Sequence, residues 1–224
     1  MSRWHGDVAL NPVKAITETF ELNAIEATLK SDRTTTVVVS GALFGKHSHY
    51  VLKRYNARNF WHRISRSVRK TRAERCWHMS YAFAKVGINV AEPIFMYEHR
   101  LFGLRRHAFF ASELVPGKEL LTIFATLEAK EKARVVSAVT CVFKALADHR
   151  LSHGDMKASN LIWDGERLTV IDLDAAQQHR CEPSWRKANQ KDKQRFLRNW
   201  RDQPELAAHF AFLSTPELTD AAAS

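Results

Sequence analysis

The sequence predicts an α+β protein of two lobes, a β-rich lobe over residues 1–115 and a short helical lobe over residues 116–224. The first observation is that strand-like runs surround one long helical pattern in the first half of the chain. The second is that helical periodicity begins directly after Pro116-Gly117. The third is the length of 224 residues with 45% hydrophobic residues, which suffices for the cores of two small lobes.

The first lobe contains a predicted β-hairpin. Residues 34–40 (TTTVVVS) are β-branched and residues 48–55 (SHYVLKRY) alternate between apolar and polar side chains. A short loop that carries Gly41 and Gly45 joins the two runs. This pattern predicts two antiparallel strands.

A long helical pattern follows the hairpin. No Gly or Pro interrupts residues 58–85, and apolar side chains recur every three or four positions, which predicts one helix or two in succession. Gly87 ends this pattern. Residues 90–97 and 109–115 read as two further strands around a basic turn at residues 100–107.

The second lobe is predicted to be mainly helical around one polar loop. Asp164-Gly165 between two short apolar runs is a strong hairpin signal directly after that loop. In chain order we expect helices at residues 120–127 and 130–149, the polar loop at 151–160, a hairpin at 161–171, a basic helix at 187–200 and a short helix at 204–213.

Charge and composition narrow the class of protein. The 34 Lys and Arg outnumber the 24 Asp and Glu, for a net charge of +10, so we expect an anionic partner. The sequence has neither a run of 18 apolar residues nor a secretory signal, which predicts a soluble or peripheral cytosolic protein. The three cysteines lack metal-site spacing. A nucleic-acid-binding module is favoured by the charge alone, because no recognition motif accompanies it.

The polar loop carries the residues that point to chemistry. It reads His-Gly-Asp155-Met-Lys157-Ala-Ser-Asn160, and the hairpin after it returns the chain to Asp172. Phosphoryl transfer from a nucleotide needs a carboxylate for the attacking hydroxyl, a cation beside the phosphoryl group, and hard oxygen ligands for magnesium. Asp155, Lys157, and Asn160 with Asp172 supply these in turn. His-Gly-Asp by itself could equally be a turn with a local side-chain hydrogen bond.

At these residues the sequence resembles the protein-kinase-like superfamily, whose catalytic loop reads His-x-Asp-x-Lys-x-x-Asn. The resemblance implies a two-lobed kinase-like fold that binds ATP and Mg²⁺. It also implies that Lys53, in Val-Leu-Lys at the end of a strand, holds the α- and β-phosphates, and that Glu74 holds Lys53. The backbone at Glu113 and Val115 would bind adenine.

Two departures from the superfamily pattern stand out. The metal motif reads Asp-Leu-Asp174 in place of Asp-Phe-Gly, and too few residues follow it for an activation segment. The loop from Gly41 to Gly45 does not spell the glycine-rich motif, so contacts from that loop to the phosphates are not implied.

Within the superfamily the sequence is most similar to the lipopolysaccharide core kinases, the Kdo and heptose kinase family. The similarity covers residues 34–200 and rests on Lys-Arg-Tyr-Asn from Lys53, on Arg-Ala-Glu-Arg-Cys-Trp from Arg72, and on His-Gly-Asp-x-Lys with Ile-Asp-Leu-Asp. It implies transfer of the ATP γ-phosphate to a sugar hydroxyl of the lipopolysaccharide inner core, an anionic glycolipid, at the cytoplasmic face of the inner membrane.

A basic stretch supports a membrane or glycolipid partner. Residues 54–75 hold eight Lys or Arg with apolar residues between them, as expected of a helix on an anionic surface. A solvated face of the first lobe would have the same pattern. Other acceptors fit the catalytic loop as well, namely those of aminoglycoside-type small-molecule kinases and RIO-like protein kinases. A pseudokinase would use the same fold without turnover.

Overall fold

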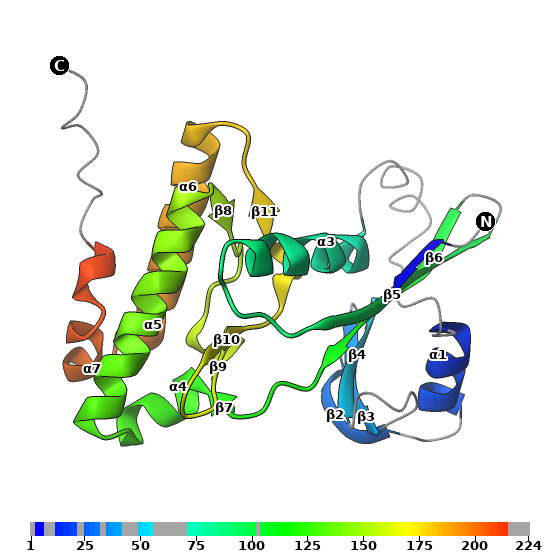
Figure 1. Ribbon diagram of the computed structural model, residues 1–224, viewed down its shortest axis with the longest axis horizontal. Helices are drawn as coiled ribbons and strands as arrows, with labels where there is room; N and C mark the ends of the chain where they lie inside the picture. Colours follow the sequence, from blue (N-terminus) through cyan, green and yellow to red (C-terminus); the bar gives the residue numbers. More distant parts are fainter. Residues whose placement is uncertain are drawn as a thin grey trace. The chain divides into compact units, whose positions relative to one another are not determined.

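The computed structural model describes residues 3–6, 12–21, 25–31, 35–41, 49–55, 71–101 and 104–214. The chain divides into two units (Figure 1). The first unit consists of Met1–Lys85, Asn89–Val115 and Asp172–Ala175, and the second of Val86–Ile88, Pro116–Ile171 and Ala176–Ser224.

The first unit is built on a six-stranded antiparallel sheet. Its strands lie in the order β1 (Arg3–Gly6), β5 (Pro93–Leu101), β6 (Leu104–Glu113), β4 (His49–Tyr55), β3 (Thr35–Gly41) and β2 (Ile25–Ser31). The register places Val38, Leu52, Ala111 and Phe95 side by side across four strands. This row of apolar side chains forms the centre of one face of the sheet.

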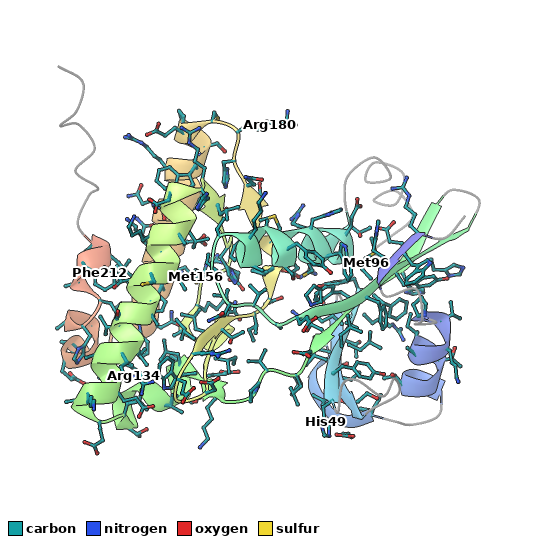
Figure 2. All side chains as sticks on the ribbon, viewed as in Figure 1. His49, Met96, Arg134, Met156, Arg180 and Phe212 are labelled. Carbon is teal, nitrogen blue, oxygen red and sulfur yellow. The ribbon has the colours of Figure 1, made fainter. Side chains whose placement is uncertain are left out.

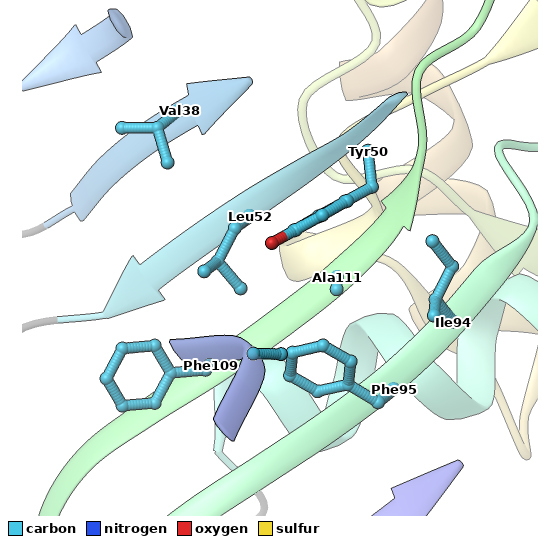
Figure 3. Packing of buried hydrophobic residues seen from close by; sticks show 8 residues of the cluster. Val38, Tyr50, Leu52, Ile94, Phe95, Phe109 and Ala111 are labelled. Atoms are coloured by element: carbon cyan, nitrogen blue, oxygen red, sulfur yellow. The ribbon is translucent and has the colours of Figure 1, made fainter. Parts of the chain in front are cut away.

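Helix α1 (Pro12–Glu21) contributes to the core on that face. Ala15 of α1 is fully buried among the side chains of the row. The hydroxyl groups of Thr19 in α1 and Tyr50 in β4 form a hydrogen bond with each other. Figure 3 shows Leu52, Phe95 and Ala111 in this cluster. Full burial of a large apolar side chain such as Leu52 or Phe95 contributes about 1.5–3 kcal/mol. This cluster therefore supplies much of the stability of the unit.

Helix α3 (Arg72–Lys85) packs on the opposite face of the sheet. Its Ala73 and Cys76 are buried against Met96 and Phe110, whose chain neighbours Phe95 and Ala111 belong to the first face. Because successive strand residues point to opposite faces, Lys53 lies on the same face as Tyr55, which contacts α3. The alternation along β4 therefore directs Lys53 toward α3.

The segment Asp172–Ala175 also belongs to the first unit. Its residues Leu173–Ala175 form the 3-10 helix η3, which packs on α3. The chain thus leaves the second unit at Ile171, contributes this short segment to the first, and returns at Ala176.

The second unit is mainly helical. Its α-helices are α4 (Leu120–Ile123), α5 (Ala129–Asp148), α6 (Glu182–Leu197) and α7 (Pro204–Ala208). Its strands form two small sheets, one of β10 (Leu168–Val170), β9 (Leu161–Trp163) and β7 (Lys118–Glu119), the other of β11 (Gln177–Gln178) and β8 (Leu151–Ser152). Short 3-10 helices complete it: η1 (Phe124–Thr126), η2 (Ala158–Asn160), η4 (Arg198–Trp200) and η5 (Ala211–Ser214). None of the helices in the described parts of the chain is long and apolar enough to cross a membrane.

An aromatic cluster joins the helices of the second unit. Phe196 of α6 lies 5.8 Å from Phe143 of α5 and 4.9 Å from Phe210, measured between ring centroids. Trp200 packs at 5.4 Å from Phe210, and Phe124 at 5.3 Å from Trp200. Phe196 and Trp200 are almost completely buried, so the last turns of α6 and η4 have one face fixed in the core.

The α+β class predicted from the sequence is confirmed, with the large sheet in the first half and most of the helix in the second. Several boundaries differ, among them the following two. The basic turn expected at residues 100–107 is mostly strand, because the β5–β6 ladder continues to the Leu101–Leu104 pair. Helix α6 begins at Glu182 instead of residue 187, since Pro183 fits the first turn of a helix. The glycine loop and most of the basic stretch, residues 42–48 and 56–70, lie outside the described residues.

Candidate active site

The loop of the second unit that contains Asp155 is held by one buried carboxylate. Asp192 of α6 is 2% exposed and accepts hydrogen bonds from the backbone N–H groups of His153 at 2.7 Å and Gly154 at 3.0 Å. The N–H of Met156 approaches the same carboxylate at 3.5 Å. Met156 is itself fully buried (Figure 2). The loop is therefore fixed both through its backbone and through the buried side chain of Met156.

His153 braces the same loop with both ring nitrogens. Nδ1 accepts the N–H of Asp155 at 3.2 Å, and Nε2 lies 2.9 Å from the carbonyl oxygen of Ile171. Since Nδ1 accepts, Nε2 carries the hydrogen and donates a hydrogen bond to the carbonyl oxygen of Ile171. Both nitrogens are engaged with the backbone, so this histidine positions Asp155 and is not placed to exchange protons with a substrate.

Asp155 lies between two cations. Its Oδ2 is 2.7 Å from Nζ of Lys157, and its Oδ1 pairs with Nη1 of Arg195 on α6. The same Arg195 nitrogen donates to the carbonyl oxygen of Gly154 at 3.2 Å. The side chain of Asp155 is 22% exposed, so solvent and a substrate can reach it. The carboxylate is held in place from two sides and stays accessible.

Asn160 closes the loop. Its Nδ2 donates to the carbonyl oxygen of Asp155 at 2.8 Å, and its own carbonyl oxygen accepts the N–H of Ile171 at 2.9 Å. Because Nδ2 faces a carbonyl, the amide oxygen Oδ1 is the atom that can serve as a cation ligand. The second of these hydrogen bonds ties Asn160 to the residue directly before Asp172.

A pocket of about 420 Å³ opens beside Asp155 in the second unit. It is lined by Asp155, Lys157, Arg195, Arg198 and Asn199. Three of these side chains carry a positive charge and one carries a negative charge, so the pocket has a net positive charge. The sequence predicted two of these residues, Asp155 and Lys157, for the site.

In the first unit the predicted site residues Lys53 and Asp172 form an ion pair. Nζ of Lys53 donates to Oδ1 of Asp172 at 2.8 Å, and the two side chains are 13% and 35% exposed. Burial alone lowers the pKa of Lys53, but the negative charge of Asp172 opposes it, and the net result is a pKa above the ordinary value. Lys53 is therefore a protonated, nearly buried cation.

Asp172 adopts a backbone conformation that is uncommon for a residue with a side chain. Its φ is +64°, in the left-handed region, which Asp tolerates better than most residues. The conformation lies directly at the point where the chain enters the first unit. Residues held this way occur often at functional sites, where the surrounding contacts fix the direction of a side chain.

Asp174 is anchored to the start of α3 by two arginines. Its carboxylate pairs with Arg72, and Nη1 of Arg75 donates to its carbonyl oxygen at 3.2 Å. Burial raises the pKa of Asp174, and the nearby charge of Asp172 raises it further, against the opposing effect of Arg72. The guanidinium of Arg72 also lies 5.0 Å from the ring centroid of Tyr55. These contacts hold η3 on α3.

Glu74 does not form the expected ion pair with Lys53 among the described residues. Its Oε1 lies 3.9 Å from Nε2 of His78, one helical turn further along α3. The buried face of α3 carries Ala73 and Cys76, whereas Glu74 is only partly buried. Lys53 has Asp172 as its carboxylate partner instead.

Glu113 and Val115 lie where the first unit ends and the second begins. The N–H of Glu113 donates to the carbonyl oxygen of Glu92 at 2.9 Å, and that of Leu114 to the carbonyl oxygen of His49 at 3.3 Å. Glu113 is the last residue of β6, and Val115 follows in an irregular segment. The adenine contacts expected of their backbone stay a prediction.

The two residues predicted to bind magnesium, one in each unit, carry side-chain oxygens of a kind that this ion prefers. Among the described residues no three His, Cys, Asp or Glu side chains are close enough to form a metal cage. Mg²⁺ in phosphoryl-transfer enzymes is held by one or two protein oxygens together with substrate phosphates and water. Asp172 and Asn160 offer oxygens of this kind.

Sequence reasoning missed Asp192 and Arg195. Both lie on α6, about forty residues after the loop that they contact. One signal for Asp192 was available, because it is an acid within a basic helix. It lies four residues before Phe196 and therefore on the same, buried face of that helix.

Lys53 pairs with Asp172, and Asp155 pairs with Lys157. Side chains of these types are the ones that phosphotransferases of the kinase class use. Residues 23–215 match the model of the lipopolysaccharide kinase (Kdo/WaaP) family, and the chain belongs to that family. The resemblance to lipopolysaccharide core kinases seen in the sequence is thereby confirmed, as is the expectation of a kinase.

A solved structure supports the fold. A protein described as "WaaP in complex with acyl carrier protein" superposes with a TM-score of 0.58 at 17% sequence identity, over 94% of this chain and 97% of that chain. At this identity the likeness concerns the fold, and it confirms the kinase-like architecture expected from the catalytic loop. Among curated proteins no sequence matches this chain.

Proposed function

We propose that this kinase transfers the γ-phosphoryl group of ATP to a sugar hydroxyl of the lipopolysaccharide inner core. The observation that carries the proposal is Asp155, a rigidly held and accessible carboxylate with Lys157 at 2.7 Å, in a chain of the lipopolysaccharide kinase family. Phosphoryl transfer depends mainly on positioning and on charge stabilisation, and this loop offers both.

Each residue has a role in the proposed reaction. Asp155 orients the acceptor hydroxyl and takes its proton as the oxygen bonds to the γ-phosphorus, while the bond from that phosphorus to the β–γ bridging oxygen breaks and ADP leaves. Lys157 offsets negative charge on the phosphoryl group in flight, and Lys53 holds the α- and β-phosphates. Asn160 and Asp172 would hold magnesium, which neutralises phosphate charge when bound. Backbone groups of Glu113 and Val115 would bind adenine.

The ion pairs of Asp155 set a condition on this chemistry. Both carboxylate oxygens contact a cation, Oδ2 that of Lys157 and Oδ1 that of Arg195. An acceptor hydroxyl has to share the carboxylate with one of them. Lys157 gains a new partner when it turns toward the phosphoryl group, so the exchange of partners frees Oδ2 for the hydroxyl without leaving a charge unpaired.

The proposed place of the reaction is the cytoplasmic face of the inner membrane. The net charge of +10 and the eight Lys or Arg in residues 54–75 support contact with anionic lipid or glycolipid, at about 1 kcal/mol for each basic residue near the surface. Neutralising Arg63, Arg66 and Arg69 should weaken binding to anionic liposomes at low salt. Unchanged binding would contradict a role of this stretch at the membrane.

The proposed activity is tested by offering several acceptors in parallel. Purified protein is incubated with γ-labelled ATP and Mg²⁺ and with dephosphorylated lipopolysaccharide, a generic protein or an aminoglycoside. We expect label on the lipopolysaccharide and none with Asp155→Asn. Label on the aminoglycoside or the protein instead would favour those kinase classes, and an absence of ATP consumption with every acceptor would favour a pseudokinase.

A further inference from the structure

The pocket beside Asp155 has more positive charge than its own carboxylate can balance. Lys157 and Arg195 both pair with Asp155. Arg198 also lines the pocket, is exposed, and makes no ion pair with any residue in the described parts of the chain. Two cations and one carboxylate already leave a net charge of +1, and Arg198 raises it to +2. Such a pocket attracts an anion.

The wall that carries Arg198 is rigid. Arg198 and Asn199 lie three and four residues after Arg195 along α6 and η4, so both lie on the same side of the helix as Arg195. The adjoining face is anchored by Phe196 and Trp200, which are 0% and 1% exposed. The backbone that carries Arg198 is therefore held in place before a ligand binds.

Asn199 gives the wall a second polar group. Its Nδ2 donates to the carbonyl oxygens of Arg195 at 2.9 Å and Phe196 at 2.7 Å, which caps the end of α6. Since Nδ2 is used in this way, the side-chain oxygen of Asn199 is the atom that can accept a hydrogen bond from a hydroxyl. An acidic or phosphorylated sugar carries both an anionic group and hydroxyl groups, so it would suit Arg198 and Asn199 together.

We infer that Arg198, with Asn199, recognises an anionic group on the acceptor sugar and thereby selects the hydroxyl that Asp155 orients. This inference rests on the proposed function, because it takes Asp155 as the residue that faces the acceptor. The pocket volume of about 420 Å³ falls within the usual range for small-ligand sites, about 300–1,000 Å³. A guanidinium binds carboxylate and phosphate with the same two-pronged geometry, so either group satisfies the pocket.

The test measures two quantities separately: binding of the oligosaccharide, by titration, and transfer of label to it from γ-labelled ATP. Core oligosaccharide released from lipopolysaccharide is prepared in its native form, in a carboxyl-reduced form and in a dephosphorylated form. Isothermal titration gives the Kd of each form for the wild-type protein, Arg198→Gln, Arg198→Lys and the control Arg201→Gln. Arg201 lies outside the pocket, is 75% exposed and contacts Asp202.

We expect Arg198→Gln to raise the Kd of the native oligosaccharide about tenfold, with partial rescue by Arg198→Lys and no change for Arg201→Gln. One of the two modified oligosaccharides should bind the wild type as weakly as the native one binds Arg198→Gln, and the substitution should weaken it no further. The modification that has this effect identifies the anion as carboxylate or phosphate.

Several outcomes would overturn the inference. One is an unchanged Kd for Arg198→Gln, and another is an equal loss with the native and both modified forms. A third is a rise in the KM for ATP with acceptor binding unchanged, which would assign Arg198 to the nucleotide. Failure of the wild type to transfer label from ATP to the dephosphorylated oligosaccharide, with charge-dependent binding intact, would refute the proposed function and leave anion recognition standing.

Discussion

Removal of the Asp192 carboxylate should destabilise the protein through the catalytic loop. The side chain is 2% exposed and accepts the N–H groups of His153 at 2.7 Å and Gly154 at 3.0 Å. A buried donor left without an acceptor costs about 1–3 kcal/mol, so Asp192→Ala should lower the free energy of unfolding by about 2–6 kcal/mol. The 3.5 Å contact with Met156 is too long to add much.

Urea unfolding monitored by tryptophan fluorescence gives this free energy, since the chain has six tryptophans. Asp202→Ala is the matched control, because Asp202 is 87% exposed and contacts Arg201 at 3.5 Å. It should change the free energy of unfolding by no more than about 0.5 kcal/mol. An Asp192→Ala protein as stable as this control would refute the reasoning.

The milder variant Asp192→Asn tests the link to activity. It keeps one acceptor oxygen but places an amide nitrogen against backbone donors, so the loop has to shift. A displacement of about 1 Å at a reacting group can lower turnover about a hundredfold. We therefore expect kcat to fall by at least about tenfold while the protein stays folded. Normal kcat would show that Asp192 has no part in placing Asp155.

Three further predictions follow from the first unit. Asp172→Ala should abolish magnesium-dependent nucleotide binding in equilibrium titrations, and binding retained at wild-type affinity would remove Asp172 from the metal site. The pKa of Lys53 is raised in the folded protein above the value of 10.5 that it has when unfolded, so its contribution to stability is complete below pH 10.5 and is lost as the pH rises through the folded pKa. The difference in unfolding free energy between wild type and Lys53→Met should therefore shrink above pH 10.5, and a constant difference would count against the pairing. Burial raises the pKa of the Cys76 thiol to about 12, so iodoacetamide at pH 8 should label the exposed Cys141 and Cys181 and leave Cys76 unmodified in intact-mass spectra; rapid triple labelling would contradict this burial.

The sequence predicted most reliably what lies within one local segment. Asp155, Lys157 and Asn160 occur in a single loop, and the Asp164-Gly165 turn brings the chain back to Asp172. Local turn chemistry sets these positions, so no long-range information was needed. The alternation along residues 49–55 likewise indicated a strand, which the structure has as β4.

Contacts between distant segments could not be predicted in the same way. Lys53 was expected to pair with Glu74 because Glu74 is the one acid in a basic stretch, but the partner among the described residues is Asp172. Which side chains of α3 face the sheet depends on the rotation of the helix about its axis, and the buried face carries Ala73 and Cys76. Arg195 was missed since a basic residue on an amphipathic helix has no local mark of its partner.

The segment Asp172–Ala175 has a consequence for synthesis of the chain. Lys53 and Asp172 are separated by 119 residues, so the first unit lacks the counter-charge of Lys53 until translation has passed through residues 116–171 of the second unit. At about 5–20 residues per second, this delay lasts about 6–24 s. A truncated chain that ends at Val115 would lack Asp172, so Lys53 would never gain this carboxylate partner. The first unit of this kinase is therefore complete only once residues 172–175 have been synthesised and have joined it.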